Sequence, residues 1–306
     1  MIECKLTNFK IRHGRTSTWP TIVLFTMTSL ILVSTIPAWG FDLQRIGTST
    51  AAAKQNQMVF LDARPLRNWQ ENHIPGAMSF SWETYTGTDA GGVKYRIFPP
   101  EKLAAALGKM GIRNTDTIVV YGDADSSWGG EGWLVWMLAW LGHQGPVYCL
   151  DGGFASWAAD KQPVSKATEA NRAPTVYALN VQPQVTISAK QIMARQKNIN
   201  LIDTRSYLTE WLPGHIPGAI HIPWEKFYTG QHRRALSPEA LKVLLIKHGV
   251  DLRKPVVYYC TGGIRSGYAW MVHELSGLPG AMNFEGGMEE WNAISRQSTA
   301  KSTAQD

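Results

Sequence analysis

An internal repeat constrains the fold of this 306-residue chain more than any other feature of its sequence. Leu61-Asp62-Ala63-Arg64, followed by His73-Ile74-Pro75-Gly76-Ala77, recurs as Ile202-Asp203-Thr204-Arg205, followed by His215-Ile216-Pro217-Gly218-Ala219. Further matching pairs keep the same order: Trp82–Gly87 with Trp224–Gly230, Pro100–Leu103 with Pro238–Leu241, Val119–Tyr121 with Val256–Tyr258, and Leu150–Gly153 with Phe284–Gly287. Because self-similarity over such a length marks a repeated structural unit, two similar domains of about 110 to 125 residues are predicted.

Each half alternates short β-branched runs with stretches of helical pattern, and Ser237-Pro238-Glu239 has the residue order that begins a helix. This alternation predicts an α/β fold with two domains, each a parallel β-sheet flanked by helices on both faces. A ligand site in such a sheet is expected beyond the carboxyl ends of the strands. The domains are expected at residues 41–162 and 185–297, joined by a polar, proline-containing linker at 163–184 and followed by a polar tail at 298–306.

One stretch of the second half carries a reactive pattern. Val256–Tyr259 is β-branched and aromatic, as expected of a buried strand, and Tyr268–Leu275 has the apolar stripe of a helix. Between them stand Cys260, two glycines and an arginine. The glycines let successive backbone N–H groups turn toward one point, and the start of a helix adds partial positive charge there. Both effects favour a thiolate, so Cys260 is predicted to be a catalytic nucleophile rather than a small buried apolar residue.

The loop after this cysteine supplies the other candidate site residues. Those expected to bind an anionic substrate, through their N–H groups or side chains, are Thr261, Gly262, Gly263, Ile264, Arg265 and Ser266. Arg265 stands at the far rim of the loop and has two possible roles. It contacts the anionic substrate, or it braces the loop by bonding to the backbone or to a carboxylate.

The other two cysteines do not suggest a site. Cys149 lies in an apolar run that is typical of a buried strand, and its expected role is that of a small core residue. Cys4 belongs to the N-terminal segment. No pair of cysteines has metal-ligand spacing, and neither a metal nor an organic cofactor is implied.

The segment from Cys260 to Ser266, after a Val-Val-Tyr strand, resembles the active-site loop of the rhodanese (sulfurtransferase) superfamily. The Asp-x-Arg and His-Ile-Pro-Gly-Ala segments and the Gly-Gly segments extend the resemblance over nearly all of residues 42–297. With the cysteine in the second domain, the order resembles that of two-domain thiosulfate and 3-mercaptopyruvate sulfurtransferases. The resemblance implies a sulfurtransferase that moves sulfane sulfur from a donor such as thiosulfate to cyanide or a thiol through a Cys260 persulfide.

The first repeat has Asp123 at the position of Cys260, followed by a longer, acidic loop that includes Asp125 and Glu131. A carboxylate cannot carry sulfane sulfur, and these acids would repel anions, so the first domain is predicted to be non-catalytic. Four bulky residues of this repeat are spaced along one helical face and are expected in the core or at an interface: Trp133, Trp136, Met137 and Trp140.

Arg205 has two interpretations. The resemblance implies that it binds substrate, because the matching position of two-domain thiosulfate sulfurtransferases contacts the sulfonate of the donor. The alternative is a structural pair with Asp203, since the inactive repeat keeps Arg64 in the same pattern. His73 and His215 also occupy matching turns in both repeats, and we expect structural roles for them.

The loop departs from both two-domain patterns. Thiosulfate enzymes usually have a basic residue two positions after the cysteine, where this chain has Gly262. Mercaptopyruvate enzymes usually have Cys-Gly-(Ser/Ala)-Gly-Val-Thr, which Thr261 and Arg265 break. The loop is more similar to that of single-domain rhodaneses, so the donor stays open between thiosulfate and 3-mercaptopyruvate.

Two rival functions share parts of the pattern. A phosphatase of related fold also uses a cysteine and an arginine, but its loop normally has five residues between them, whereas Cys260 and Arg265 enclose four. A sulfur-carrier or binding module would form the same persulfide and show little turnover with small acceptors.

The N-terminal segment predicts export. Basic residues precede sixteen uncharged, mostly apolar residues at Thr21–Ile36, and Ala38-Trp39-Gly40 fits a cleavage site before Phe41. Residues 1–40 are therefore predicted to be a signal peptide of a periplasmic protein, with an uncleaved membrane anchor as the alternative. In that compartment an external system must keep Cys260 reduced or protect it as a persulfide.

The charge balance limits the partners. The formal net charge is +6, and residues 41–306 carry 26 basic and 23 acidic residues without a basic run. This composition does not suggest nucleic acid. The expected partners are a small anionic sulfur donor and a thiol or cyanide acceptor. We expect a monomer without stable membrane contact once the signal peptide is cleaved.

Overall fold

The computed structural model describes residues 40–167 and 172–303, without the side chains of Asp125 and of residues 297–303. All of these residues belong to one compact unit. Apart from Gly40, the predicted signal peptide lies outside the described residues, so cleavage and export stay predictions. Within the described ranges, no helix combines the length and the apolar character needed to cross a bilayer.

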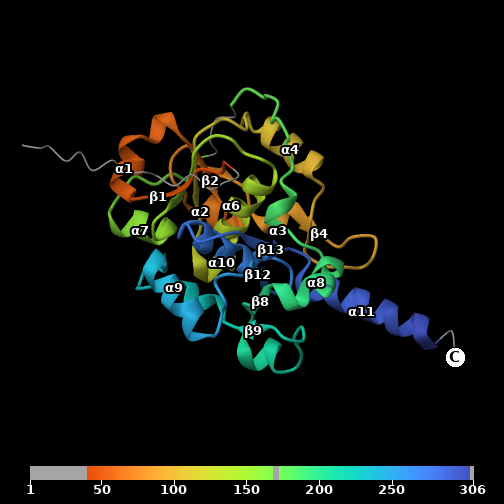
Figure 1. Cartoon of the computed structure of the whole chain (residues 1–306). Coiled ribbons are helices and arrows are strands. Elements are labelled where there is room, and N and C mark those ends of the chain that lie inside the picture. The colour runs from red at the N-terminus through yellow and green to blue at the C-terminus, as the bar shows by residue number, and fades with distance from the viewer. Residues whose placement is uncertain (1–39, 168–171, 304–306) are drawn as a thin grey trace, which may run out of the picture. The chain divides into compact units, whose positions relative to one another are not determined.

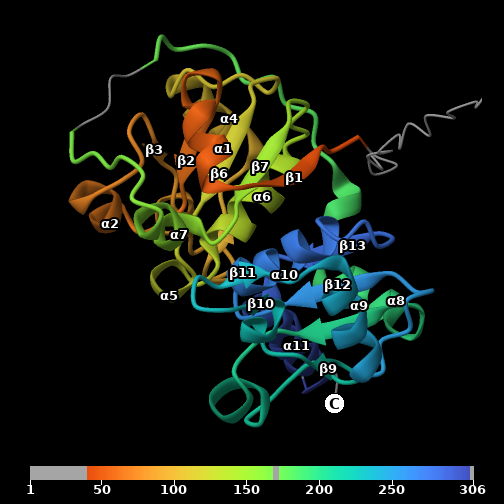
Figure 2. The ribbon, with the colours of Figure 1, turned by 90° about the vertical axis from the view of Figure 1, so that its left-hand side faces the viewer.

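The first domain is built on a five-stranded parallel sheet in the order β1-β7-β6-β2-β3 (Figure 1 and Figure 2). Its strands are β1 (Leu43–Ile46), β2 (Val59–Asp62), β3 (Met78–Ser79), β6 (Ile118–Tyr121) and β7 (Val147–Leu150), with a separate hairpin of β4 (Thr86–Gly87) and β5 (Arg96–Ile97). Its helices are α1 (Thr48–Ala53), η1 (Gln55–Gln57), α2 (Leu66–Glu71), α3 (Trp82–Tyr85), α4 (Pro100–Lys109), α5 (Ala124–Ser127), α6 (Gly130–Trp140) and α7 (Gly153–Ala159).

Helices cover both faces of this sheet because successive residues of a strand point to opposite sides. Leu61 and Val120 pack into a core that includes residues of α4 and α6. Phe60 and Val119 pack into a second core that includes Trp157 of α7 and residues of α1. The continuous apolar runs of β2 and β6 are therefore buried on both faces, as a parallel sheet requires.

The second domain repeats the arrangement with four parallel strands in the order β13-β12-β8-β9. Its strands are β8 (Asn200–Asp203), β9 (Ile220–His221), β12 (Val256–Tyr259) and β13 (Ala281–Phe284), with a hairpin of β10 (Tyr228–Thr229) and β11 (Arg234–Ala235). Its helices are η2 (Pro183–Val185), α8 (Ala189–Arg195), η3 (Gln196–Asn198), η4 (Tyr207–Trp211), η5 (Trp224–Phe227), α9 (Pro238–Lys247), α10 (Ile264–Glu274) and α11 (Gly287–Thr303).

The second sheet also has a core on each face. Ile202 and Tyr258 pack into the core with α9 and α10, whereas Leu201 and Val257 pack into another with α8 and α11. The structure thus confirms the predicted α/β class, with two parallel sheets flanked by helices on both faces. It also confirms the start of α9, where the Ser237 hydroxyl accepts a hydrogen bond from the Ala240 N–H.

Two helices, one from each domain, pack directly against each other. A Cβ atom on Gly132 of α6 would lie 2.2 Å from the Cα of Tyr268 in α10, and one on Gly267 would lie 2.9 Å from the Cα of Trp133. The two backbones approach this closely because glycine has no side chain. Trp133, Trp136 and Met137 of the predicted bulky face of α6 lie in the core around this crossing, and Trp140 packs against that core while partly buried, which confirms the prediction.

Two helix boundaries differ from the sequence prediction. α10 begins at Ile264 rather than at Tyr268, because Gly263 adopts the left-handed conformation (φ +85°) and turns the chain into the helix at once. α11 continues to Thr303 and so includes much of the predicted polar tail. The earlier start of α10 places Arg265 and Ser266 in its first turn, next to the cysteine loop.

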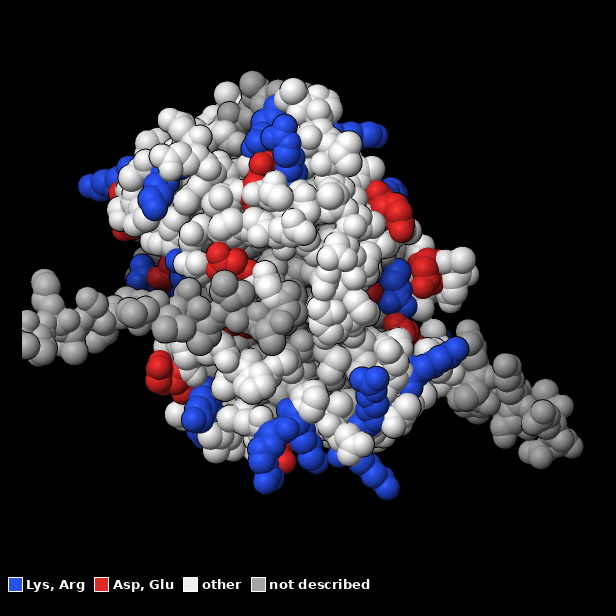
Figure 3. Space-filling view, turned by 45° about the horizontal axis from the view of Figure 1, so that its top comes forward, with Lys and Arg blue, Asp and Glu red and all other residues white. Residues whose placement is uncertain are grey.

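The segment between the domains runs along the first one. Ser165 pairs with His73 as an isolated antiparallel bridge, and the Thr175 N–H donates to the Gly108 carbonyl. Tyr177 is buried and its hydroxyl contacts the ring of His143. On the face that Figure 3 shows, basic and acidic side chains lie among uncharged ones rather than in one large patch of a single sign.

Candidate active site

Cys260 directly follows β12 and lies at the carboxyl end of the central part of the second sheet, as the sequence predicted. Its side chain is 2 % exposed. Two backbone hydrogen bonds join the loop to the first turn of α11. The Met288 N–H donates to the Cys260 carbonyl (2.9 Å), and the Glu289 N–H donates to the Thr261 carbonyl (3.2 Å). Gly287 permits this approach, since a Cβ there would lie 2.4 Å from the Cys260 carbonyl oxygen.

The loop presents free donors around the thiol. Within the described part of the chain, the backbone N–H groups from Thr261 to Arg265 donate to no other group. They belong to the turn and to the first residues of α10, where N–H groups have no partner inside the helix. The loop therefore provides a positively polarised cradle for an anionic sulfur atom.

A buried hydroxyl also contacts the sulfur atom. The Ser266 Oγ lies 3.6 Å from the Cys260 Sγ and 2.7 Å from the Asn283 Oδ1. The Asn283 Nδ2 in turn donates to the Gly263 carbonyl at 3.1 Å. Asn283, on β13, therefore fixes both the loop and the hydroxyl beside the thiol.

Arg265 is held by a carboxylate that the sequence analysis did not single out. Its Nη1 and Nη2 both donate to Glu210, each at 2.6 Å, and Nη2 also donates to the Thr261 Oγ1 at 2.9 Å. The Thr261 hydroxyl donates to Glu210 at 2.7 Å. Burial alone would raise the pKa of Glu210, but the hydrogen bonds from Arg265 and Thr261 lower it to about 2. Interactions with Glu210 and Cys260 outweigh burial and raise the pKa of Arg265.

Both hydrogen bonds of this ion pair support the bracing role of Arg265. The guanidinium nevertheless stands close enough to Cys260 to interact with a thiolate there. Arg265 therefore braces the loop and adds positive charge beside the sulfur, which unites parts of the two predicted roles.

A comparison of residue spacing between the two repeats points to the segment that contains Glu210. The spacing from the Asp that both repeats share to the tryptophan is seven residues in the first repeat (Asp62 to Trp69) and eight in the second (Asp203 to Trp211). The structure accommodates the extra residue in η4 as a π-helical turn, from which Glu210 reaches Arg265. Such single-residue insertions into helices are frequent at functional sites.

A cavity of about 570 Å³ opens above Cys260. The second domain contributes its inner part, with Cys260, Thr261, Gly262, Ile264 and Arg265, and its side, with Ser206, Thr209, Glu210 and Glu225. The first domain contributes three aromatic side chains: Trp82, Tyr95 and Trp128. The volume suits a small organic substrate.

Gly262 is required by the contact between the domains. A Cβ atom at this position would lie 2.4 Å from the Cβ of Tyr95. From the sequence, this glycine was expected only as part of the anion-binding turn. Its second role depends on a residue of the other repeat, which no local pattern reveals.

Two of the predicted binding residues lie behind the cavity and one lies away from it. Gly263 and Ser266 support the loop but do not line the cavity. Arg205 is buried and donates to Asp203 through Nε (3.0 Å) and Nη2 (2.7 Å), and to the Gly214 carbonyl (2.8 Å). This arrangement matches the structural alternative, and Arg64 makes the same pair with Asp62 in the first domain.

Comparison with known proteins agrees with this architecture. The family of rhodanese-like domains matches the chain twice, over residues 49–160 and 188–294. The chain belongs to the rhodanese family. Both matches lie within the two α/β domains, which confirms the tandem arrangement of rhodanese-like domains.

Curated relatives cover most of both domains. A protein of Mycolicibacterium smegmatis named "Putative thiosulfate sulfurtransferase" is 30% identical over 244 residues, which is 74% of this chain and 85% of the relative. A protein of the same name from Saccharopolyspora erythraea is 31% identical and covers 72% and 82%. "Putative thiosulfate sulfurtransferase SseA" of Mycobacterium leprae is 31% identical over 271 residues, with 82% and 84% covered.

Solved structures share the fold. The 3-mercaptopyruvate sulfurtransferase SseA of Escherichia coli superposes with a TM-score of 0.70 at 20% identity and covers 80% of this chain and 98% of its own. The wild-type structure of EanB has a TM-score of 0.71 at 19% identity and covers 81% and 67%. At these identities the likeness concerns the fold.

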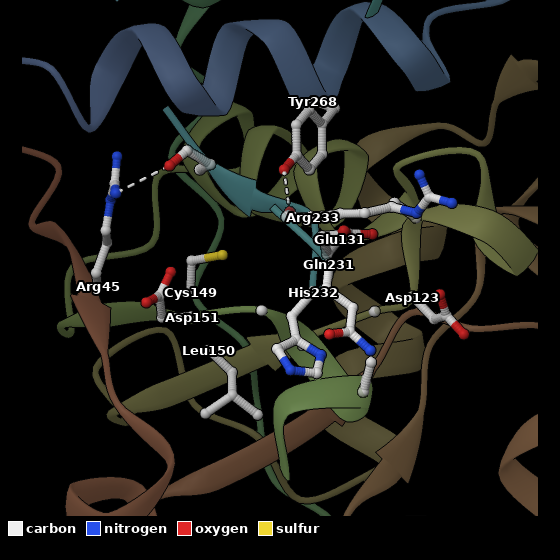
Figure 4. A pocket seen from close by; sticks show the side chains of 16 residues that line it. Arg45, Asp123, Glu131, Cys149, Leu150, Asp151, Gln231, His232, Arg233 and Tyr268 are labelled. Carbon is white, nitrogen blue, oxygen red and sulfur yellow. Dashed lines mark hydrogen bonds between the residues drawn. The ribbon is translucent and has the colours of Figure 1, made fainter. Parts of the chain in front are cut away.

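The first rhodanese-like domain has a different constellation at the equivalent place. Its helix α6 begins after Gly129 in the left-handed conformation, as α10 begins after Gly263, and Glu131 takes the helical position of Arg265. The pocket there measures about 50 Å³, and Figure 4 shows Asp123, Glu131 and Cys149 around it. Burial raises the pKa of Glu131 to about 7 and the pKa of Cys149 well above its usual range.

Cys149 is a free, buried cysteine of the core on β7, as expected. The structure corrects the predicted equivalence of Asp123 and Cys260 by one residue. Tyr121 pairs with Asp62 as Tyr259 pairs with Asp203, and the Gly122 carbonyl accepts from the Phe154 N–H as the Cys260 carbonyl accepts from the Met288 N–H. Gly122 therefore stands at the cysteine position and Glu131 at the arginine position, so this pocket lacks a thiol nucleophile at the loop. Among the described residues, no cluster of three or more histidine, cysteine or acidic side chains is placed to hold a metal ion.

Proposed function

We propose that this protein is a sulfurtransferase in which the Cys260 thiolate accepts sulfane sulfur as a persulfide and passes it to a thiophilic acceptor. The observation that carries the proposal is the cradle of N–H groups from Thr261 to Arg265 around a buried thiol at the base of a cavity. The curated relatives named for thiosulfate sulfurtransferase activity support the same reaction class.

The first half-reaction is a displacement at sulfur. The Cys260 thiolate attacks the outer sulfur of thiosulfate, the S–S bond of the donor breaks, and sulfite leaves with the bonding electron pair. The outer sulfur then carries the negative charge as Cys–S–S⁻. The free N–H groups of the loop stabilise this charge, in the manner of an oxyanion hole.

The second half-reaction regenerates the thiolate. Cyanide or a thiolate attacks the outer sulfur of the persulfide, and the bond between the two sulfur atoms breaks with its electrons returning to Cys260. The products are thiocyanate or a hydropersulfide. The persulfide form of the enzyme remains after sulfite has left, and the acceptor then reacts with it. Ping-pong kinetics are therefore expected.

Arg265 supports both steps. Its positive charge stabilises the thiolate as nucleophile in the first step and as leaving group in the second. The Ser266 hydroxyl donates its proton to Asn283 and positions the loop. Glu210 keeps the guanidinium in place through two hydrogen bonds.

The donor is proposed to be thiosulfate, with 3-mercaptopyruvate as the alternative, which the SseA-type relatives support. Thiosulfate and 3-mercaptopyruvate both present an anion that the polarised loop can receive. A carrier function, in which the persulfide is delivered to a partner protein, would use the same residues.

The test is thiocyanate formation from thiosulfate and cyanide by the purified protein and by its Cys260→Ser variant. We expect the substitution to lower the rate at least about 1000-fold, because the hydroxyl cannot form a persulfide. Cys149→Ala is the matched control, since Cys149 is also buried and free, and we expect it to keep the activity.

Intact mass spectrometry of the donor-treated protein separates the alternatives. A gain of one sulfur atom that needs Cys260, without turnover on either donor, would favour the carrier function. Turnover that persists in Cys260→Ser, or no sulfur gain with either donor, would contradict the proposed function.

A further inference from the structure

The outer wall of the cavity is aromatic and comes from the non-catalytic domain. Trp82 and Tyr95 contact each other edge to face with ring centroids 6.1 Å apart. Trp128 is 55% exposed, and the Arg265 guanidinium carbon lies 5.7 Å from the centre of its ring. The faces of such rings carry partial negative charge and attract cations.

The ionised side chains of the lining leave one negative charge uncompensated. These side chains, besides Cys260, are Glu210, Glu225 and Arg265. Arg265 and Glu210 neutralise each other through their double hydrogen bond. Glu225, in η5, is exposed and has no ion-pair or hydrogen-bond partner among the described residues. The rim of the cavity is therefore negative, whereas the loop around the thiol is positively polarised.

The difference in charge between the rim and the inner end of the cavity suits the two substrates, which bind one after the other. A small anionic donor fits the N–H groups at the inner end of the cavity, next to Cys260. A larger acceptor extends from the persulfide toward Glu225 and the three aromatic rings. Its thiolate end meets the polarised loop, and its other end meets a surface that attracts positive charge and apolar groups.

We propose that the cavity selects, as sulfur acceptor, a thiol that carries an ammonium group on a short apolar body, with Glu225 and Trp128 as specificity-determining residues. The proposal rests on the sulfurtransferase function proposed above. The acceptor thiolate attacks the outer sulfur of the Cys260 persulfide (Cys–S–S⁻), and the bond between the two persulfide sulfur atoms breaks. The products are the hydropersulfide anion R–S–S⁻ and the Cys260 thiolate. The ammonium group takes no part in the bonds that form or break.

The experiment measures single-turnover transfer from the Cys260 persulfide to three small thiols. These are 2-aminoethanethiol (cationic), 2-mercaptoethanol (neutral) and 3-mercaptopropionate (anionic). Because each thiol has its own intrinsic reactivity, the quantity compared is the ratio of the cationic to the anionic rate in wild type and variants. We expect Glu225→Gln to lower this ratio roughly fivefold, since one charge at the rim is removed. Glu225→Lys should lower it further.

The chain provides a matched control. Glu83 occupies the position of Glu225 in the first repeat, is exposed, and does not line the cavity. Glu83→Gln should leave the ratio unchanged. Trp128→Leu keeps an apolar side chain but removes the ring, so it should slow transfer to the cationic thiol more than transfer to the neutral one.

A second readout does not depend on sulfur transfer. Tetramethylammonium ions should slow the alkylation of the Cys260 thiol by iodoacetamide in the wild type and do so less in Glu225→Lys. Neutral tert-butanol, of similar size, serves as the probe without charge. Equal protection by both probes, or equal protection in both proteins, would contradict the proposed site.

The outcomes distinguish this proposal from the one on which it rests. A persulfide that passes to cyanide, with the same cationic-to-anionic ratio in wild type and Glu225→Gln, would overturn the acceptor selectivity and leave the sulfurtransferase intact. If no persulfide forms, the sulfurtransferase proposal fails, and the alkylation experiment alone decides whether the cavity binds organic cations.

Discussion

At the scale of single residues, the ion pair of Arg265 and Glu210 shapes the site. Arg265 brings positive charge to a buried thiol, but an unpaired guanidinium that is 11% exposed would be costly. Glu210 offsets this cost and fixes the planar group through two hydrogen bonds. The ion pair thus fixes the orientation of the Arg265 guanidinium and adds no net charge to the cavity.

The Glu210 carboxylate predicts a pH-dependent contribution to stability. Its folded-state pKa is lowered to about 2, so the contribution is fully present above the ordinary glutamate pKa and is lost as pH falls from about 4.5 toward 2. We expect Glu210→Gln to reduce the free energy of unfolding by about 2 kcal/mol at pH 7, allowing for solvent screening, and by less at pH 3.

Urea unfolding at pH 7, 4 and 3 measures this difference. Glu225→Gln is the control, because its carboxylate lies in the same cavity without a partner among the described residues, and it should change stability little at any of these pH values. A Glu210→Gln effect of the same size at all three values would show that the charge does not matter.

At the scale of elements, the crossing of α6 and α10 joins the domains. Gly132 and Gly267 let the two backbones meet, and the buried tryptophans around them fill the space beside the crossing. Because α10 also begins at the cysteine loop, the same contact places the aromatic side chains of the first domain above Cys260.

We expect Gly132→Ala to reduce the free energy of unfolding by about 3 kcal/mol, because its Cβ would lie 2.2 Å from the Tyr268 Cα and the helices must separate. Gly214→Ala is the control, since its Cβ would meet nothing within 4 Å and Gly214 does not need a positive φ. Denaturant unfolding of both variants measures the costs. Similar small effects would mean that α6 and α10 can shift apart freely.

At the scale of the whole molecule, the repeat produces two unequal versions of one contact between domains. Arg96 of the first domain pairs with Glu285 (2.8 Å) and Glu290 (2.9 Å) of the second. The counterpart is Arg234 of the second domain, which lies 3.5 Å from Asp151 of the first and is about half exposed. The stronger contact lies beside the Cys260 loop, where Gly263 packs on Glu285.

Replacing each arginine by methionine tests this asymmetry. Arg96→Met leaves Glu285 buried without its charge partner, and we expect a loss of about 3 kcal/mol in unfolding free energy. Arg234→Met breaks an exposed pair and should cost less than about 1 kcal/mol. Both losses are measured by denaturant unfolding at constant pH. If the two variants lose the same unfolding free energy, the difference in burial between the two ion pairs does not determine their contributions to stability.

Much of the fold and of the inner site was predictable because its signals are local or repeated. The apolar runs of β8 and β12 and the turn glycine Gly263 depend on neighbouring residues of the chain. Glu210 was missed because its meaning depends on Arg265, 55 residues away, and its signal was a spacing difference of one residue between the repeats.

Periodicity, turn glycines and the repeat act along the chain, so they predicted two α/β domains and a cysteine in the glycine-containing loop of the second domain. Only the folded chain shows that the first domain contributes to the cavity, that Gly262 has no room for a side chain, and that Arg205 pairs with Asp203. The physical reason is that packing and charge pairing depend on distances between residues that are remote in sequence, and these distances exist only once the chain has folded.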